Sequence, residues 1–303
     1  MRRSWMAVVG MALLAGCSRE PGSTVITKGI LNAECDEAVY PVVKLEADDF
    51  HQQYQDATVI LRPVEAREAV ADFAQDSTEF IVCGRELNTG ERNALAAAKV
   101  DIQEYKVALT AVAVIVNAEN PVTTLRMGEL DSIYSGMLDR WPGTRRSIDA
   151  VIGGRNSSAN EVFRDVVLKG RDFDRAATPI DSSDQLVAYV RSHRDAIGIV
   201  GLNWVKSGEG GVTAVGLGTP GFRPDSTEPF GAFYTPHPAY VYQRYYPITT
   251  PIYIYSRKKS QDVGLGFISF VSSPPGQRIF LNNDLVPVTQ PVRLVSLTSQ
   301  QVN

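Results

Sequence analysis

The sequence predicts an α/β protein with two lobes, each built on a mixed, mostly parallel sheet flanked by helices. Short apolar runs alternate with helix-like segments along most of the chain, which is typical of parallel sheets covered by helices on both faces. The 303 residues are 44% hydrophobic and can bury a substantial core, and this length favours two lobes over one. The third observation is a modest charged fraction of 21%, typical of an ordinary soluble globular protein.

The first seventeen residues have the pattern of an export signal. Arg2 and Arg3 precede an apolar run at 5–16, which is too short to span a bilayer but matches a signal-peptide core. The letters LAGC at 14–17 resemble a bacterial lipobox, in which the cysteine is lipidated and becomes the first mature residue. We therefore expect residues 1–16 to be a lipoprotein signal peptide and Cys17 to be lipidated. The alternative is a plain secretory signal with a chance cysteine.

Residues 17–24 are expected to be the lipidated N-terminus and a short tether, because SREPGST is rich in Ser, Gly and Pro. Strands and helices then alternate by apolar periodicity. Strands are predicted at 24–37, 57–64, 79–87, 107–121, 196–205 and 249–257, and also at 146–158, where the strand runs into a turn that begins at 154. Helices are predicted at 41–54, 66–75, 126–136, 159–170, 182–195, 262–272 and 275–282. Regularity fades at 206–246, where the aromatic and proline-rich part at 229–246 is either a loop lining a cleft or an irregular surface segment.

The stretch GRNSSANEVF, residues 154–163, joins a predicted strand to a predicted helix. The first amides of a helix lack internal partners and carry the positive end of the helix dipole, so this turn is a candidate anion site. Arg155, Asn156, Ser157 and Ser158 would supply charge and hydrogen-bond donors to an anion. The alternative is local: Asn156, Ser157 or Ser158 caps the helix and Arg155 faces solvent.

Cys35 and Cys83 remain after the expected lipidation of Cys17. Each ends an apolar, strand-like run, and export makes a disulfide between them chemically permissible. Two buried free thiols are the equally weighted alternative. A metal site is not expected, because the chain has no CxxC motif and its histidines are scattered. Removing residues 1–16 leaves a net charge of about −6 with no basic run, which argues against a nucleic-acid partner.

Several motifs occur in a characteristic order: IVCGRELNTGE, AVAVIVNAENPVTTLRMGELDSIYSGMLDRWPG, RNSSANEVF, DAIGIVGLNWV, YPITTPIYIYSR and FISFVSSPPGQRIFLNNDLVPV. Together they resemble the substrate-binding lipoproteins of phosphate ABC importers, the PstS-like group of the type 2 periplasmic-binding-protein superfamily. The resemblance covers nearly all of the mature chain. It implies two lobes joined by two crossing segments, with the ligand held in the cleft between them.

The resemblance assigns residues 25–108 and 247–303 to lobe 1 and residues 109–246 to lobe 2. It implies a monomeric binding protein without cofactor or catalysis, which captures inorganic phosphate and delivers it to an ABC permease in the inner membrane. The protein would be anchored by lipid in the cell envelope and face the periplasm. Closure around the ligand would be a hinge motion.

Carried over by position, Ser157 matches the serine of the family's phosphate loop, and Arg155 lies close to its arginine. Ser158 stands where the family has glycine, and Ala159 where it has threonine. Losing the threonine hydroxyl removes one hydrogen bond to a charged ligand, which is worth roughly 1.5–3 kcal/mol.

The predicted first lobe places acidic residues near the expected ligand. The family's Gly-Ser-Thr type loop is replaced by CDEAVYP, which contains Asp36 and Glu37, and RPVEARE brings Glu65. These carboxylates are poor neighbours for a dianion, unless one accepts the proton of hydrogen phosphate. Arg85 either supplies compensating charge to the ligand or belongs to an ion pair within the protein.

Three other functions are compatible with parts of the sequence. The same fold could bind another oxyanion or act as a phosphate sensor without a permease. A surface lipoprotein could bind another protein through 229–246. A hydrolase using Ser157 or Ser158 would need a base nearby, and the sequence offers no G-x-S-x-G context, so the chain is expected not to be an enzyme.

Overall fold

The computed structural model describes residues 27–205, 210–218, 232–257 and 263–289. The predictions for the signal peptide 1–16, for Cys17 and for the tether 17–24 lie outside these residues. No helix within the described ranges combines the length and apolar character that crossing a membrane requires.

The described elements alternate much as the periodicity predicts. The strands are β1 (Gly29–Asp36), β2 (Ala57–Val64), β3 (Phe80–Cys83), β4 (Ile102–Asn117), β5 (Thr124–Arg126), β6 (Asp149–Ile152), β7 (Thr178–Pro179), β8 (Ala196–Gly201), β9 (Val212–Ala214), β10 (Gly216–Gly218), β11 (Thr249–Arg257) and β12 (Val286–Pro287). The helices are η1 (Glu37–Val39), α1 (Tyr40–Gln53), α2 (Ala66–Ala74), α3 (Thr89–Ala97), α4 (Met127–Tyr134), α5 (Ser158–Val166), α6 (Ser183–Ser192), η2 (Leu202–Trp204), α7 (Pro238–Tyr242), α8 (Val263–Ser272) and α9 (Pro274–Asn282).

One mixed sheet connects most of the molecule, with strands in the order β2-β1-β3-β11-β4-β8-β6-β7. The pairs β1–β2, β1–β3, β6–β8 and β6–β7 are parallel, whereas β11 and β4 pair antiparallel with each other and with their other neighbours. The α/β fold class with a mixed, mostly parallel sheet flanked by helices is therefore confirmed. The antiparallel pairs lie in the middle of the sheet.

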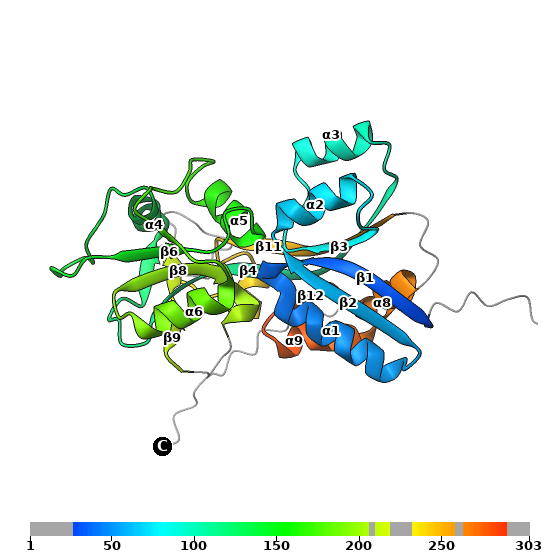
Figure 1. Ribbon diagram of the computed structural model, residues 1–303. Coiled ribbons are helices and arrows are strands. Elements are labelled where there is room, and N and C mark those ends of the chain that lie inside the picture. Colours follow the sequence, from blue (N-terminus) through cyan, green and yellow to red (C-terminus); the bar gives the residue numbers. More distant parts are fainter. Residues whose placement is uncertain (1–26, 206–209, 219–231, 258–262, 290–303) are drawn as a thin grey trace, which may run out of the picture.

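The long strand β4 links the two ends of this sheet (Figure 1). Residues 102–111 of β4 pair with β11, and residues 112–116 pair with β8. We call the elements β1–β3, α1–α3, α8, α9 and β11 the β1 side, and the elements α4–α6 and β5–β10, with η2, the β8 side. The predicted lobe boundary at 108/109 falls inside β4, and the division into lobes stays a prediction.

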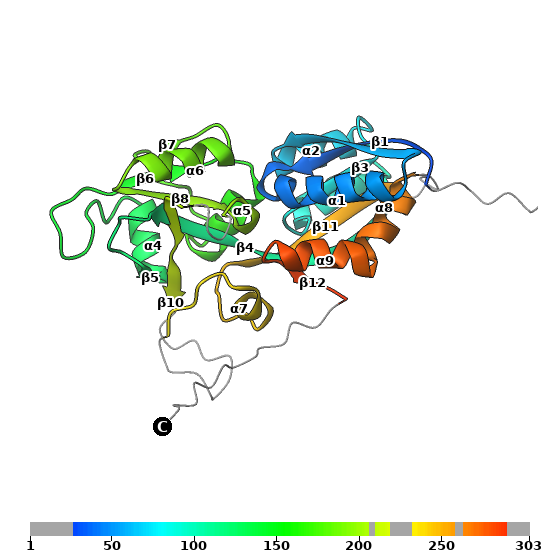
Figure 2. The same cartoon turned by 90° about the horizontal axis from the view of Figure 1, so that it is seen from below.

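Helices cover both faces of the sheet on each side. On the β1 side, α2 and α3 lie on one face, and α1, α8 and α9 lie on the other (Figures 1 and 2). Helix α1 begins with Pro41 in its first turn and buries Val42, Val43, Ala47 and Phe50 on one face. Pro is favoured there because the first helical amides have no internal partner. Each side has its own apolar core, with α1 and α8 in one cluster and β8 and α6 in another.

Two predicted strands agree with the structure residue for residue, at 57–64 and 249–257. Helix α3 was not predicted, although Asn88 and Glu91 form a capping box at its N-terminus. Helix α7 and the short strands β5, β7, β9, β10 and β12 were also not predicted. Helix α7 and these strands are too short for apolar periodicity to reveal them, whereas α3 buries only Leu95 and so has no apolar face to detect.

Candidate functional site

The turn before α5 is held by its own hydrogen bonds. Ser157 is the N-cap of α5, and its side chain accepts from the Asn160 amide N–H at 3.4 Å. The Asn160 side chain donates to the carbonyls of Gly153 at 2.9 Å and Gly154 at 2.8 Å. Arg155 is exposed to solvent. For Ser157 and Arg155 the structure therefore shows the arrangement of a helix cap, one of the two predicted alternatives.

Asp36 brings three segments together at the N-terminus of α5. Its side chain lies at the end of β1 and is completely buried. The carboxylate accepts hydrogen bonds from the backbone N–H of Gly84 at 2.9 Å and of Ala38 at 3.2 Å. The side chain and the backbone of Ser158 also hydrogen-bond to it. Asp36 and Ser158, both predicted site residues, are thus in direct contact.

Gly84 is required by this close packing. A Cβ atom on Gly84 would lie 2.5 Å from Ser158 Oγ and 3.0 Å from Asp36 Oδ2. Burial raises the pKa of Asp36 above its ordinary value, while the hydrogen bonds from Ser158, Gly84 and Ala38 act in the opposite direction. The four donors around Asp36 form a site suited to one negatively charged group.

Glu37, the next residue, begins η1, and its side chain binds the N-terminus of α6. Its Oε1 accepts from the Ser183 N–H at 2.7 Å, and its Oε2 accepts from Ser183 Oγ at 2.9 Å. Burial raises the pKa of Glu37, and the two hydrogen bonds from Ser183 partly offset this effect. The Glu37 carbonyl accepts from Trp204 Nε1 at 3.0 Å. Glu37 therefore connects η1 to α6 and η2 and does not lie at the N-terminus of α5.

Arg85 forms a buried ion pair within the protein. Its Nε donates to Glu161 Oε2 at 2.5 Å, and its two Nη atoms donate to Glu91 at 2.6 and 2.8 Å. Burial lowers the pKa of Arg85, but the neighbouring Glu91 and Glu161 carboxylates outweigh it, so the pKa is raised overall. Of the two predicted roles for Arg85, the structure shows the ion pair.

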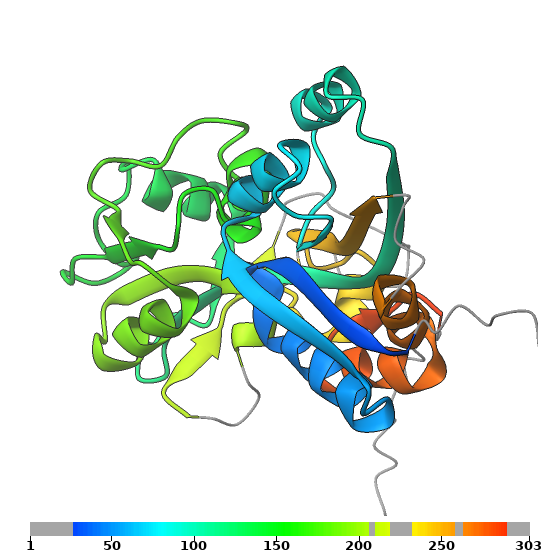
Figure 3. The same cartoon turned by 45° about the vertical axis from the view of Figure 1, so that its right-hand side comes forward.

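Glu161 also binds Arg67, which donates through Nε at 3.0 Å and through Nη2 at 2.5 Å. Glu161 was not predicted as a site residue. It lies three positions after Ser158, and residues at this spacing share one helix face. Figure 3 shows α2, which carries Arg67, next to α5, which carries Glu161. The spacing from Ser158 is the sequence signal that could have identified it.

The segment after β2 completes the contact with the turn before α5. The Arg67 N–H donates to the Asn156 carbonyl at 3.3 Å. A Cβ atom on Gly154 would overlap the Glu65 carboxylate. Asn156 thus contacts the β1 side through its backbone, and Glu65 lies beside Gly154.

Cys35 and Cys83 are both buried and free. The structure thus has two buried thiols at these positions, one of the two predicted alternatives. Burial raises the pKa of both thiols well above the ordinary value. Among the residues that the structure describes, no cluster of His, Cys, Asp and Glu could hold a metal ion.

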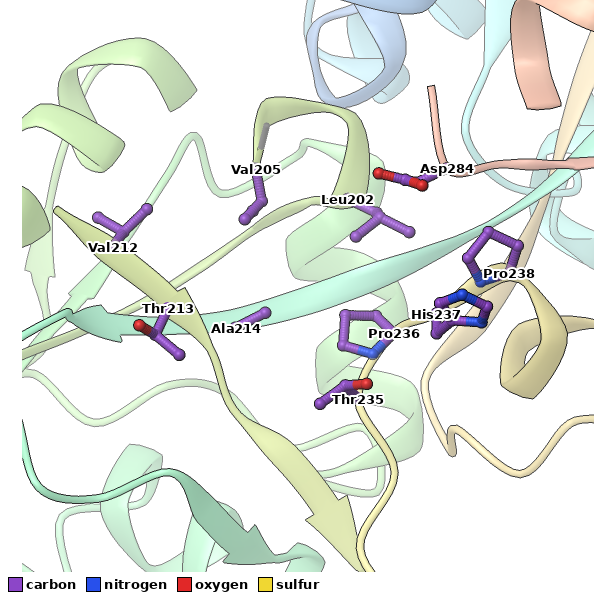
Figure 4. A pocket seen from close by; sticks show the side chains of 10 residues that line it. All are labelled: Leu202, Val205, Val212, Thr213, Ala214, Thr235, Pro236, His237, Pro238 and Asp284. Carbon is purple, nitrogen blue, oxygen red and sulfur yellow. The ribbon is translucent and has the colours of Figure 1, made fainter. Parts of the chain in front are cut away.

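The described chain has pockets elsewhere on the molecule, with volumes of 280, 340, 480 and 600 Å³. None of them is lined by Asp36, Arg85 or Ser157. Figure 4 shows the pocket of 280 Å³, in which Pro236, His237 and Pro238 face η2 and β9. Part of the aromatic segment 229–246 therefore lines a pocket, away from the N-terminus of α5.

Comparison with known proteins identifies the family. The PBP superfamily domain matches residues 20–275, which is most of the chain. The chain belongs to the PBP superfamily. Within it, the phosphate-binding protein PstS of Staphylococcus epidermidis is 23% identical over 283 residues, covering 89% of this chain and 84% of PstS.

Solved PBP-type structures share the fold. A Clostridium perfringens protein with bound phosphate superposes with a TM-score of 0.74 at 22% identity, covering 86% of this chain and 100% of the other. An ABC-type phosphate transport receptor from Vibrio cholerae gives a TM-score of 0.63 at 18% identity, covering 84% and 99% of the two chains. Membership of the PBP superfamily and the predicted fold are confirmed.

Proposed function

We propose that the chain is an extracytoplasmic binding protein that takes up inorganic phosphate at the N-terminus of α5. The observation that carries this proposal is the set of hydrogen-bond donors from Gly84, Ala38 and Ser158 that converge on one carboxylate. An oxyanion satisfies such donors as a carboxylate does, and a helix N-terminus favours its charge. Gly84 and Ala38 donate from the β1 side and Ser158 donates from the β8 side. A ligand held between two lobes requires donors from both.

We propose phosphate as the ligand, and not another oxyanion, because similar proteins are named for phosphate. PstS of Staphylococcus epidermidis and the Vibrio cholerae receptor are named for phosphate, and similarity to them extends over most of this chain. Ser157 and Ser158 retain hydroxyls close to the proposed ligand. Arg85 contributes no free charge, because Glu91 and Glu161 already neutralise it. We therefore expect the hydrogen bonds of the helix N-terminus, and not an arginine, to account for most of the affinity.

Delivery to an ABC permease and attachment through a lipidated Cys17 complete the proposal. Lobes closing around phosphate would present a new surface to the permease. Lipid attachment would keep the protein in the cell envelope, facing the periplasm. A Cys17→Ser variant expressed with its own signal tests this attachment. We expect the variant to lose its membrane association, whereas an unchanged membrane fraction contradicts lipidation.

Isothermal titration with phosphate, arsenate, sulfate and molybdate tests the ligand. We expect heat with phosphate and none with sulfate at millimolar concentration. Gly84→Ala places a methyl group against Ser158 and Asp36 and should abolish binding. Gly128→Ala is the matched control, since a Cβ there meets nothing within 4 Å. Heat with molybdate or sulfate alone would assign another oxyanion, and no heat with any anion would refute the proposal.

A further inference from the structure

Carboxylates of this chain bind helix N-termini across the sheet. Asp36 of the β1 side binds Ser158 at the start of α5, on the β8 side. Glu37, also before α1, binds the N–H and hydroxyl of Ser183 at the start of α6. Both helix N-termini therefore already have an anionic partner from within the chain, at the positions where external anions bind in proteins.

A buried ion pair also connects the β1 side to the β8 side. Glu161 of α5 reaches across to Arg85 and Arg67 of the β1 side. Arg85 and Glu161 each have a side-chain exposure of 8%, so water does not screen their interaction. Separating the two sides would leave these charges without partners until water reached them.

The Asp36 carboxylate occupies the donors that a bound oxyanion would use. Gly84, Ala38 and Ser158 all donate to it, and it has no access to solvent. A tetrahedral anion cannot accept from the same N–H groups while Asp36 remains in place. The two negative groups would also repel each other at this distance.

We infer that Asp36 is an internal ligand, which holds the β1 side and the β8 side together without an external anion. The Asp36 carboxylate must then be displaced before phosphate binds. The closure by Asp36 does not depend on the proposed function. The displacement of Asp36 by phosphate rests on the proposed function. Closure is then the resting state of the protein, and phosphate competes with a carboxylate that is already attached to the chain. The apparent affinity for phosphate is lowered by the fraction of molecules in which Asp36 occupies the site.

Two measurements on the full mature chain test this inference. The first is hydrogen exchange in phosphate-free buffer, followed in the peptides that contain Gly84 and Ser158, whose N–H groups donate to Asp36. We expect these amides to exchange at least about tenfold more slowly in the wild type than in Asp36→Ser, because the variant lacks the carboxylate that holds them. Equal exchange in the two proteins would overturn the inference.

The second measurement is phosphate affinity by titration calorimetry. Asp36→Ser should bind phosphate at least about tenfold more tightly than the wild type, since the internal competitor is gone. Unchanged or weaker binding would overturn the inference, because Asp36 would then be neutral or a direct acceptor of the phosphate proton. If neither protein binds phosphate but the exchange difference remains, the proposed function fails and the internal closure stands.

Variants at other carboxylates control for folding. Glu34→Gln removes a buried carboxylate from the same strand β1, one that pairs with Arg62 and not with α5. It should change neither the exchange near Ser158 nor the phosphate affinity. Glu161→Gln is not a control but a further test of closure. It should weaken the contact between the β1 side and the β8 side and leave the donors around Asp36 intact. It should speed exchange at Ser158 in the same direction as Asp36→Ser, and a wild-type rate would count against closure by these carboxylates.

Discussion

Glu46 offers the clearest test of the energetics, because it is a buried carboxyl group with no partner among the residues that the structure describes. It lies on the buried face of α1 with 1% of its surface exposed. Neither of its carboxyl oxygens has a hydrogen-bond partner within the described ranges of the chain. Burial, assisted by the charge of Asp49, raises the pKa of Glu46 from 4.5 to about 9. The carboxyl group is therefore protonated in the folded protein at neutral pH and ionised in the unfolded chain.

The sign of the pH dependence follows from this difference. The contribution of Glu46 to the free energy of unfolding is largest below pH 4.5, and it falls as the pH rises from 4.5 towards about 9. Each pH unit in this window costs about 1.4 kcal/mol, so the loss at pH 7 is about 3 kcal/mol. Glu46→Gln keeps a neutral group of the same shape at every pH and should avoid this loss.

Urea unfolding at pH 5 and pH 7 measures the effect. We expect Glu46→Gln to be about 3 kcal/mol more stable than the wild type at pH 7, and the gain to fall below about 1 kcal/mol at pH 5. Asp48→Asn is the matched control on the same helix. Asp48 is exposed and forms a surface ion pair with Lys44, so the variant should change stability by less than about 1 kcal/mol. Equal pH dependence in Glu46→Gln and the wild type would refute the reasoning.

Three further outcomes are expected. Glu161→Ala should lower the free energy of unfolding by about 3 kcal/mol, because Arg85 keeps only Glu91 as a buried partner, and a loss below about 1 kcal/mol in urea unfolding would contradict this. Gly84→Ala should lower the free energy of unfolding by about 1–3 kcal/mol through overpacking, and so lower the melting temperature by several degrees. Gly128→Ala should leave the melting temperature unchanged or raise it. Equal melting temperatures for the two variants would count against the close packing at Gly84. Cys35 and Cys83 should react with a thiol reagent only after unfolding and without prior reduction, and a need for reductant would instead indicate a disulfide.

The local features of the site could be predicted from the sequence. Ser157 caps α5 because a serine before an apolar helix face satisfies a free helix amide, and this depends only on neighbouring residues. The strand at 57–64 was predicted for the same reason, since its pattern of apolar residues is local. The position of the candidate anion site followed from these two kinds of signal.

The contacts across the sheet could not be predicted in this way. Arg85 and Glu161 are separated by 76 positions in the chain, and either could equally have paired with a near neighbour. The sequence placed Asp36 near the ligand but gave no sign that Gly84 and Ser158 would donate to it. Such contacts depend on how closely the two sides of β4 approach, which composition and periodicity do not determine.

A crystal structure of the protein grown with phosphate tests the central claim most directly. The account predicts a tetrahedral anion at the N-terminus of α5 that accepts hydrogen bonds from Ser158 and Gly84, with the Asp36 carboxylate moved away from these donors. Phosphate bound elsewhere, with Asp36 still accepting from Gly84 and Ser158, would contradict it.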